Sequence, residues 1–240
     1  MIGSLDGHYT LPWIWAFLLI GLAPWVLGIL LAGFVERLQP RPLRRVEADD
    51  RVLELWVRER RLPVRGDVII VPVAPDLQMA AGIAKWVRDS TANSVQQEAL
   101  RVAPLPPGEA FVGRGAKHRF RRAALAVVMD DQKRSRPEWV RAAVCEAIRA
   151  ARAEGASTFI LPDFTEDLLR QPRTITEEQR LATARPTARA LVEAATESLI
   201  PGDRVVLWIW RRGTETIYAE ELDRVAREVE VSGGSPAPAH

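Results

Sequence analysis

Two loops hold the residue types best suited to chemistry. The first runs from Pro72 to Asp76 and leads into the small-residue segment 78–83, QMAAGI. Small side chains let a phosphate or a ribose approach the backbone closely, although close packing of a helix on a sheet favours the same residues. The second loop, residues 163–167, contains Asp163, Glu166 and Asp167. These carboxylates could hold Mg²⁺ or act as an acid and base pair.

The rest of the sequence offers few groups for catalysis or metal binding. The three histidines are scattered, the single cysteine stands apart from other metal-binding residues, and no Ser-His-Asp or Cys-His pattern is present. A basic cluster at residues 114–122 is more typical of a solvated loop than of a phosphate, nucleic-acid or membrane contact. The net charge is only +2, which argues against a general nucleic-acid field. We therefore predict no catalytic residue, no metal, no cofactor and no nucleic-acid partner.

Apolar runs and helical patterns alternate along residues 51–230. The runs at 68–71, 125–129, 159–161 and 205–209 are typical of strands buried on both faces, and 52–57 favours a further strand. Helices are predicted over 137–154, over 186–199, and directly after Pro75, where Asp76 can serve as the cap. This alternation predicts an α/β fold of three layers with a mixed or mostly parallel sheet. In such sheets ligands bind beyond the carboxyl ends of the strands, where both loops lie.

The first 35 residues differ from the rest of the chain. Residues 11–35 contain no charged residue, and all but five of them are apolar, which is long enough to cross a bilayer. Four arginines follow within residues 36–45 and no basic residue precedes, so the positive-inside rule places the N-terminus outside and the domain in the cytoplasm. We predict a tail at 1–10, a single-pass helix of the cell membrane at 11–35, a basic linker at 36–50 and a disordered tail at 231–240.

The order of several motifs resembles the macro domain family. Residues 67–75 (DVIIVPVAP) precede 80–84 (AAGIA), and 107–112 (PGEAFV) then leads to 125–129 (LAVVM). In that family a strand ends in Val-Asn-Ala-Ala-Asn, a Gly-rich segment opens a helix, and a Gly-Glu-Ala element leads into a strand. The similarity spans about residues 52–229 and implies a macro-like fold that binds ADP-ribose or a relative. The implied ligand-binding residues are Asp67, Ala74, Asp76, Ala80, Ala81, Gly82, Ile83, Asp163, Phe164 and Thr165.

The sequence departs from the family where catalysis would occur. The two asparagines of the strand-end motif correspond to Pro72 and Pro75, which have no side-chain amide to orient a ribose or a water. The glycine-rich second loop corresponds to residues 163–167, whose carboxylates would repel a pyrophosphate unless a metal or an arginine intervened. Asp67 resembles the adenine-reading aspartate of the family but lies closer to the strand. Residues 168–185 form an insertion that could be a lid or a solvated loop.

We therefore expect a membrane-anchored cytoplasmic module that is not a catalyst. Its partners would be the lipid bilayer, through residues 11–35, and an ADP-ribose-like nucleotide or an ADP-ribosylated protein. Two alternatives stay open. One is a protein-interaction domain with a degenerate cleft, and the other is a divergent ADP-ribosyl hydrolase that uses Asp163, Glu166 and Asp167.

Overall fold

The computed structural model describes residues 41–57, 62, 64–115, 120–165, 177–210 and 213–233. The chain divides between Arg41 and Pro42 into two units, and the second unit holds every helix and strand given below. The predicted tail at 1–10 and the predicted membrane helix at 11–35 lie outside the described residues and stay predictions. Among the described residues, no helix combines the length and the apolar character needed to cross a bilayer.

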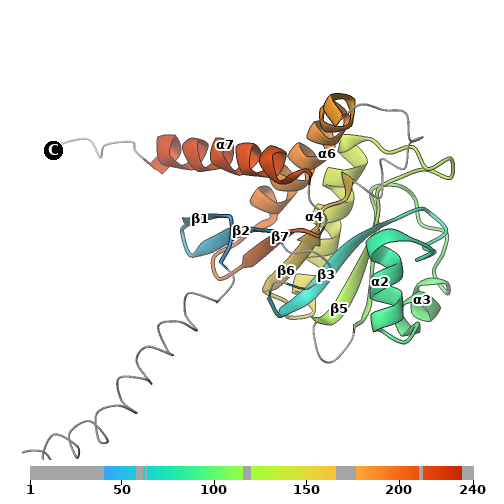
Figure 1. Ribbon diagram of the computed structural model, residues 1–240. Coiled ribbons are helices and arrows are strands. Elements are labelled where there is room, and N and C mark those ends of the chain that lie inside the picture. Colours follow the sequence, from blue (N-terminus) through green and yellow to red (C-terminus); the bar gives the residue numbers. More distant parts are fainter. Residues whose placement is uncertain are drawn as a thin grey trace, which may run out of the picture. The chain divides into compact units, whose positions relative to one another are not determined.

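Seven strands form one mixed sheet in the order β1-β2-β7-β6-β3-β5-β4 (Figure 1). The central strands pair in parallel, and the edge strands β1 and β4 run antiparallel to their neighbours. In the register, Val71 lies opposite Leu125 and Ile69 opposite Ile160, so the apolar runs of the sequence form the middle of the sheet. The strands are β1 Arg44–Ala48, β2 Arg51–Val57, β3 Gly66–Val73, β4 Ala110–Arg114, β5 Phe120–Val127, β6 Thr158–Pro162 and β7 Arg204–Ile209.

Helices cover both faces of the sheet and confirm the predicted α/β class. On one face lie α2 (Gly82–Ser90) and α3 (Ser94–Ala99), and on the other lie α4 (Pro137–Ala153), α6 (Glu177–Ser198) and α7 (Glu215–Gly233) (Figure 1). Each face has its own apolar core, because side chains of a strand alternate between the two sides. Val68, Ile70 and Leu207 belong to the core under α4 and α6, whereas Ile69 and Trp208 belong to the core under α2.

The domain extends beyond its predicted boundaries at both ends. Strand β1 lies inside the segment 36–50 that was predicted to be a linker, and its residues pair antiparallel with β2. The strand was missed because it is an exposed edge strand whose sequence, RRVEA, has no apolar run. Helix α7 continues to Gly233, into the predicted tail at 231–240. Residues 234–240 lie outside the described residues.

Two helices begin at other positions than the sequence indicates. Helix α2 begins at Gly82 and not directly after Pro75, since the intervening residues form a turn. Helix α6 begins at Glu177, so Pro186 lies inside the helix and not in its first turn. The last part of the predicted insertion, 177–185, therefore belongs to α6, while residues 166–176 lie outside the described residues.

Candidate functional site

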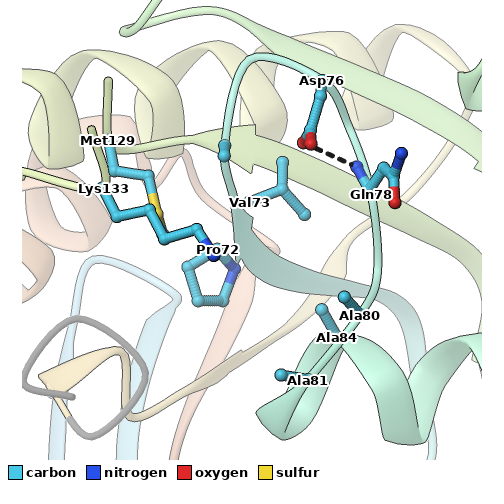
Figure 2. Close-up of a pocket in the computed structure, with 10 residues that line it drawn as sticks. Pro72, Val73, Asp76, Gln78, Ala80, Ala81, Ala84, Met129 and Lys133 are labelled. Atoms are coloured by element: carbon cyan, nitrogen blue, oxygen red, sulfur yellow. Dashed lines mark hydrogen bonds between the residues drawn. The ribbon is translucent and has the colours of Figure 1, made fainter. Parts of the chain in front are cut away.

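A pocket of about 300 Å³ opens at the carboxyl end of β3 (Figure 2). Its walls come from the loop between β3 and α2, from the start of α2, and from the turn after β5. This is where parallel sheets hold ligands, and it includes the predicted residues Ala74, Asp76, Ala80 and Ala81. The lining residues are Pro72, Val73, Ala74, Asp76, Gln78, Ala80, Ala81, Ala84, Met129 and Lys133.

The loop between β3 and α2 is a fixed turn. Leu77 has a left-handed backbone with φ 53°, and its N–H donates to the carbonyl of Ala74 at 2.9 Å. The Asp76 carboxylate accepts the backbone N–H of Gln78 at 3.1 Å, which is the geometry of an Asx turn. Leu77 and Met79 are fully buried, so the loop is anchored while Asp76 and Gln78 remain exposed at the pocket.

A buried glutamine of α3 binds the backbone of this loop through its side-chain amide. The side chain of Gln96 is 8% exposed, and its Oε1 accepts the backbone N–H of Met79 at 2.8 Å. Its Nε2 donates to the carbonyl of Leu77 at 3.5 Å, which is a long and weak bond. Gln96 was not predicted as a site residue. The one sequence feature that indicates its burial is its spacing of three residues from Ala99, which places both on the same face of the helix.

The pocket reaches the N-terminus of α2. Ala81 precedes the helix with extended backbone, and its own side chain makes no capping hydrogen bond. Gly82 follows with φ 57°, in the left-handed region that glycine adopts without strain. A helix N-terminus carries partial positive charge, and it attracts anions. The predicted site residue Ile83, in contrast, is fully buried and packs in the core.

The turn after β5 brings residues to the pocket that sequence analysis missed, Met129 and Lys133. Asp130 Oδ1 accepts the backbone N–H groups of Gln132 and Arg134, both at 2.9 Å. The backbone N–H of Arg134, helped by its guanidinium, lowers the pKa of the Asp130 carboxyl below its usual value. This ionised carboxylate holds the turn, and Lys133 within it has φ 60°.

Asp163, Phe164 and Thr165 lie apart from the pocket lining. Asp163 is 1% exposed, and Phe164 and Thr165 are fully buried. Asp163 Oδ1 accepts the backbone N–H of Thr165 at 2.8 Å and its hydroxyl at 2.6 Å. The same oxygen accepts the Tyr218 hydroxyl at 2.9 Å, and Oδ2 accepts the Thr214 hydroxyl at 2.6 Å. This Asp163 cluster joins the end of β6 to α7.

The Asp163 cluster is a packing element, not an open acid. Donors from three residues satisfy the carboxylate, which stabilises its charge in the interior. Burial, and after it the negative charge of Asp163, raises the pKa of Tyr218 well above its usual 10.0. Asp163 is thus buried and both of its carboxylate oxygens accept hydrogen bonds, whereas the hydrolase alternative assumed an open acid; that alternative stays a prediction. Glu166 and Asp167 lie outside the described residues.

Asp67 lies at the opposite end of β3 from the pocket. Its Oδ2 accepts the backbone N–H groups of Ser157 and Thr158, each at 3.1 Å. Asp67 therefore aligns the start of β6 with the start of β3. Because it is the second residue of β3, it lies away from the pocket at the carboxyl end of that strand. Among the described residues, no group of three or more histidine, cysteine, aspartate or glutamate side chains is arranged to hold a metal ion.

The fold of this chain is similar to that of several solved macrodomain structures. No protein-family model and no curated protein matches the chain. A macrodomain from Oceanobacillus iheyensis with bound MES has a TM-score of 0.59 and 14% identity, covering 77% of this chain and 97% of that one. A point variant of the Oceanobacillus iheyensis macrodomain with ADPR has a TM-score of 0.58 and 14% identity, covering 77% and 98%.

A third solved structure is a macrodomain from Trypanosoma brucei in complex with ADP. Its TM-score is 0.57 at 13% identity, covering 71% of this chain and 68% of that one. At this level of identity the likeness concerns the path of the backbone, not the residues of the site. The described part of this chain has the macrodomain fold.

Proposed function

We propose that this chain is a membrane-anchored, non-catalytic macrodomain-like module that binds an ADP-ribose-like nucleotide, free or attached to a partner protein. The observation that carries the proposal is the pocket at the carboxyl end of β3, which opens onto the N-terminus of α2. Such a helix end favours the negative charge of a pyrophosphate. Two solved structures of similar fold, one with ADPR and one with ADP, support the ligand class.

The lining of the pocket supports binding without hydrolysis. Pro72 forms part of the wall and Pro75 is buried beside it, and both stand where the family motif has asparagines. A proline offers no side-chain donor or acceptor that could orient a water or a ribose. Among the described lining residues, only Asp76, Gln78 and Lys133 have polar side chains. A pocket of this kind can hold a nucleotide but has few groups for moving protons.

Calorimetric titration of the full-length chain, purified in a nonionic detergent, with ADP-ribose tests the binding. We expect saturable heat in the wild type and none in Ala81→Arg, because a long side chain beside α2 would fill the pocket. Ala182→Arg adds the same side chain at an exposed position of α6 and serves as the matched control. Absence of heat in the wild type at millimolar ADP-ribose would remove nucleotide binding from the proposal.

Release of ADP-ribose from an ADP-ribosylated protein tests the non-catalytic part. We expect no release above the rate of the buffer, since Pro72 and Pro75 have no amide to position a water. Turnover that is lost in Ala81→Arg and retained in Ala182→Arg would show that the pocket is catalytic. A protein-interaction role with an unused cleft predicts instead that partners captured from solubilised membranes remain bound to Ala81→Arg.

The membrane anchor is a separate part of the proposal and rests on residues 11–35. We expect the chain to remain in the membrane pellet after carbonate extraction, and we expect a chain lacking residues 1–40 to be released. We also expect protease added to the outside of intact cells to spare the domain, because the arginines after the span favour the cytoplasm. Extraction of the full chain by carbonate would contradict the anchor without affecting nucleotide binding.

A further inference from the structure

Lys133 brings a positive charge to a wall of the pocket that is otherwise apolar. Lys133 lines the same pocket as Met129 and Pro72, and in Figure 2 its side chain points toward Pro72. Within the described part of the chain, the ammonium group has no ion pair and no hydrogen-bond partner. The neighbouring Arg134, in contrast, is paired with Asp130 at 2.8 Å. The charge of Lys133 is therefore available to a ligand.

The backbone of Lys133 adopts a conformation that is unfavourable for a residue with a side chain. Its φ of 60° lies in the left-handed region, where glycine would be less strained. The turn nevertheless holds Lys133 there, because its N–H donates to the Asp130 carbonyl at 2.9 Å. The Asp130 carboxylate binds the N–H groups of Gln132 and Arg134 on either side. A strained backbone conformation that neighbouring hydrogen bonds maintain beside a pocket indicates a functional role for the residue, here ligand binding by the Lys133 side chain.

The negative charge in the described lining of the pocket is that of Asp76, which comes from a different wall than Lys133. Asp76 belongs to the loop between β3 and α2, and Figure 2 shows its carboxylate bonded to the backbone of Gln78. One of its carboxylate oxygens already accepts the backbone N–H of Gln78. The two ends of the pocket therefore differ in sign, and an anionic group of a ligand is favoured at the end formed by Lys133, Pro72 and Met129.

The chemistry of lysine narrows the class of anion. An ammonium group is a compact charge with three rotatable donors and suits a phosphate, whereas planar carboxylates are matched better by the fork of an arginine. A ribose at this end would meet Pro72 and Met129, which offer its hydroxyl groups no strong partner. We propose that Lys133 is a specificity-determining residue that makes the pocket prefer a nucleotide ending in a phosphate, such as a nucleoside diphosphate, over one ending in a ribose. This inference rests on the proposed function of the same pocket.

Titrations of the full-length chain with ADP and with ADP-ribose test the inference. We expect the wild type to bind ADP more tightly than ADP-ribose. Lys133→Gln should weaken ADP binding by about tenfold or more, the range for losing a charged hydrogen bond, and should leave ADP-ribose binding unchanged. Lys85→Gln removes the same charge from an exposed position of α2 that is outside the pocket lining, and it is the matched control.

Two further variants separate binding from folding. Lys133→Gly should lose the same affinity for ADP while its melting temperature stays equal or rises, because glycine relieves the left-handed strain. Asp76→Asn should strengthen ADP binding, because it removes a negative charge and its side-chain oxygen can still accept the Gln78 N–H. Salt should weaken ADP binding more in the wild type than in Lys133→Gln.

The outcomes distinguish this inference from the proposed function. Tighter binding of ADP-ribose than of ADP, or equal ADP affinity in the wild type and in both Lys133 variants, would overturn the role of Lys133 and leave the nucleotide pocket in place. A wild-type chain that binds neither ligand would overturn the proposed function, and the inference with it.

Discussion

Replacing Tyr218 by phenylalanine tests whether the Asp163 cluster is a charged and buried packing element. Tyr218 of α7 is fully buried, and its hydroxyl donates to Asp163 Oδ1 at 2.9 Å. Hydrogen bonds to a charged group contribute about 1.5–3 kcal/mol each. The donors from Thr165 and Thr214 remain in the variant, so Asp163 loses one hydrogen-bond partner and keeps the others. We expect Tyr218→Phe to lower the free energy of unfolding by about 2 kcal/mol between pH 7 and 9.

The same variant should change the pH dependence of stability. The pKa of Tyr218 is raised above 10.0 in the folded chain, first by burial and then by the charge of Asp163. Between pH 10 and the raised pKa, the unfolded chain loses the phenolic proton and the folded chain keeps it, so stability falls as the pH rises. The stabilisation is complete below pH 10 and decreases by up to about 1.4 kcal/mol per pH unit above it. At pH 11 the wild type should have lost about 1.4 kcal/mol from this group, so its advantage over Tyr218→Phe shrinks to below about 1 kcal/mol.

Urea unfolding followed by tryptophan fluorescence measures this difference across pH 7 to 11. Other groups that titrate at high pH are shared by the wild type and the variant, and they cancel in the difference between their free energies. Thr214→Val is the matched control, because it removes another donor to Asp163 but has no titrating hydroxyl in this range. Its deficit relative to the wild type should stay constant with pH. A deficit of Tyr218→Phe that is equally constant from pH 8 to 11 would refute the raised pKa, and no deficit at pH 8 would refute the hydrogen bond.

Three further substitutions test the supports of the pocket and the sheet. Gln96→Leu should lower the free energy of unfolding by about 1–3 kcal/mol, because the buried N–H of Met79 loses its acceptor, and calorimetry should show weaker nucleotide binding as the loop loosens. Glu54→Leu should cost about 2 kcal/mol or more in urea unfolding, because it leaves Arg204 without its 2.6 Å partner, whereas Glu54→Gln should cost less. Gly115→Ala should lower the melting temperature, because its new Cβ would lie 2.7 Å from the backbone nitrogen of Arg122. An unchanged melting temperature or unfolding free energy in any of them would contradict the contact concerned.

The central part of the fold could be predicted because its signals are local. The apolar runs at 68–71, 159–161 and 205–209 are continuous, as expected of parallel strands buried on both sides, and they form β3, β6 and β7. The helix predicted over 137–154 became α4, with Pro137 in its first turn. These elements depend on periodicity and on end signals that a few residues carry, so a single sequence suffices for them.

The elements that were misplaced depend on contacts between distant residues. Asp76 has the side chain of a helix cap, yet it accepts the N–H of Gln78 and stabilises a turn. Gln96 of α3 binds the backbone N–H of Met79 and holds the loop in this conformation. Pro186 has the character of a first-turn residue, yet α6 begins earlier and Leu181 already packs against the core. Strand β1 is defined by its pairing with β2 and not by its own sequence. Local patterns carry no information about such partners.

Four of the ten described residues that line the pocket were predicted from the sequence, Ala74, Asp76, Ala80 and Ala81. The small residues Ala74, Ala80 and Ala81 were expected at the pocket, since a strand end that leads to a helix is a local feature. Lys133 was not expected, because it comes from a different segment and reaches the pocket only through the turn centred on Asp130. Asp163 was expected at the ligand and is enclosed instead, since Tyr218 and its other donors lie far along the chain.

The position of Asp163 also changes the electrostatic argument about this pocket. Read from the sequence, residues 163–167 place carboxylates where a pyrophosphate would lie, which favoured a degenerate cleft. In the folded chain Asp163 is buried, accepts hydrogen bonds from Thr165, Thr214 and Tyr218, and is not among the described residues that line the pocket. Lys133, which was not predicted as a site residue, places a positive charge on the pocket wall, and its ammonium group has no partner among the described residues. The described charges thus favour an anionic ligand at the carboxyl end of β3, as the proposed function requires.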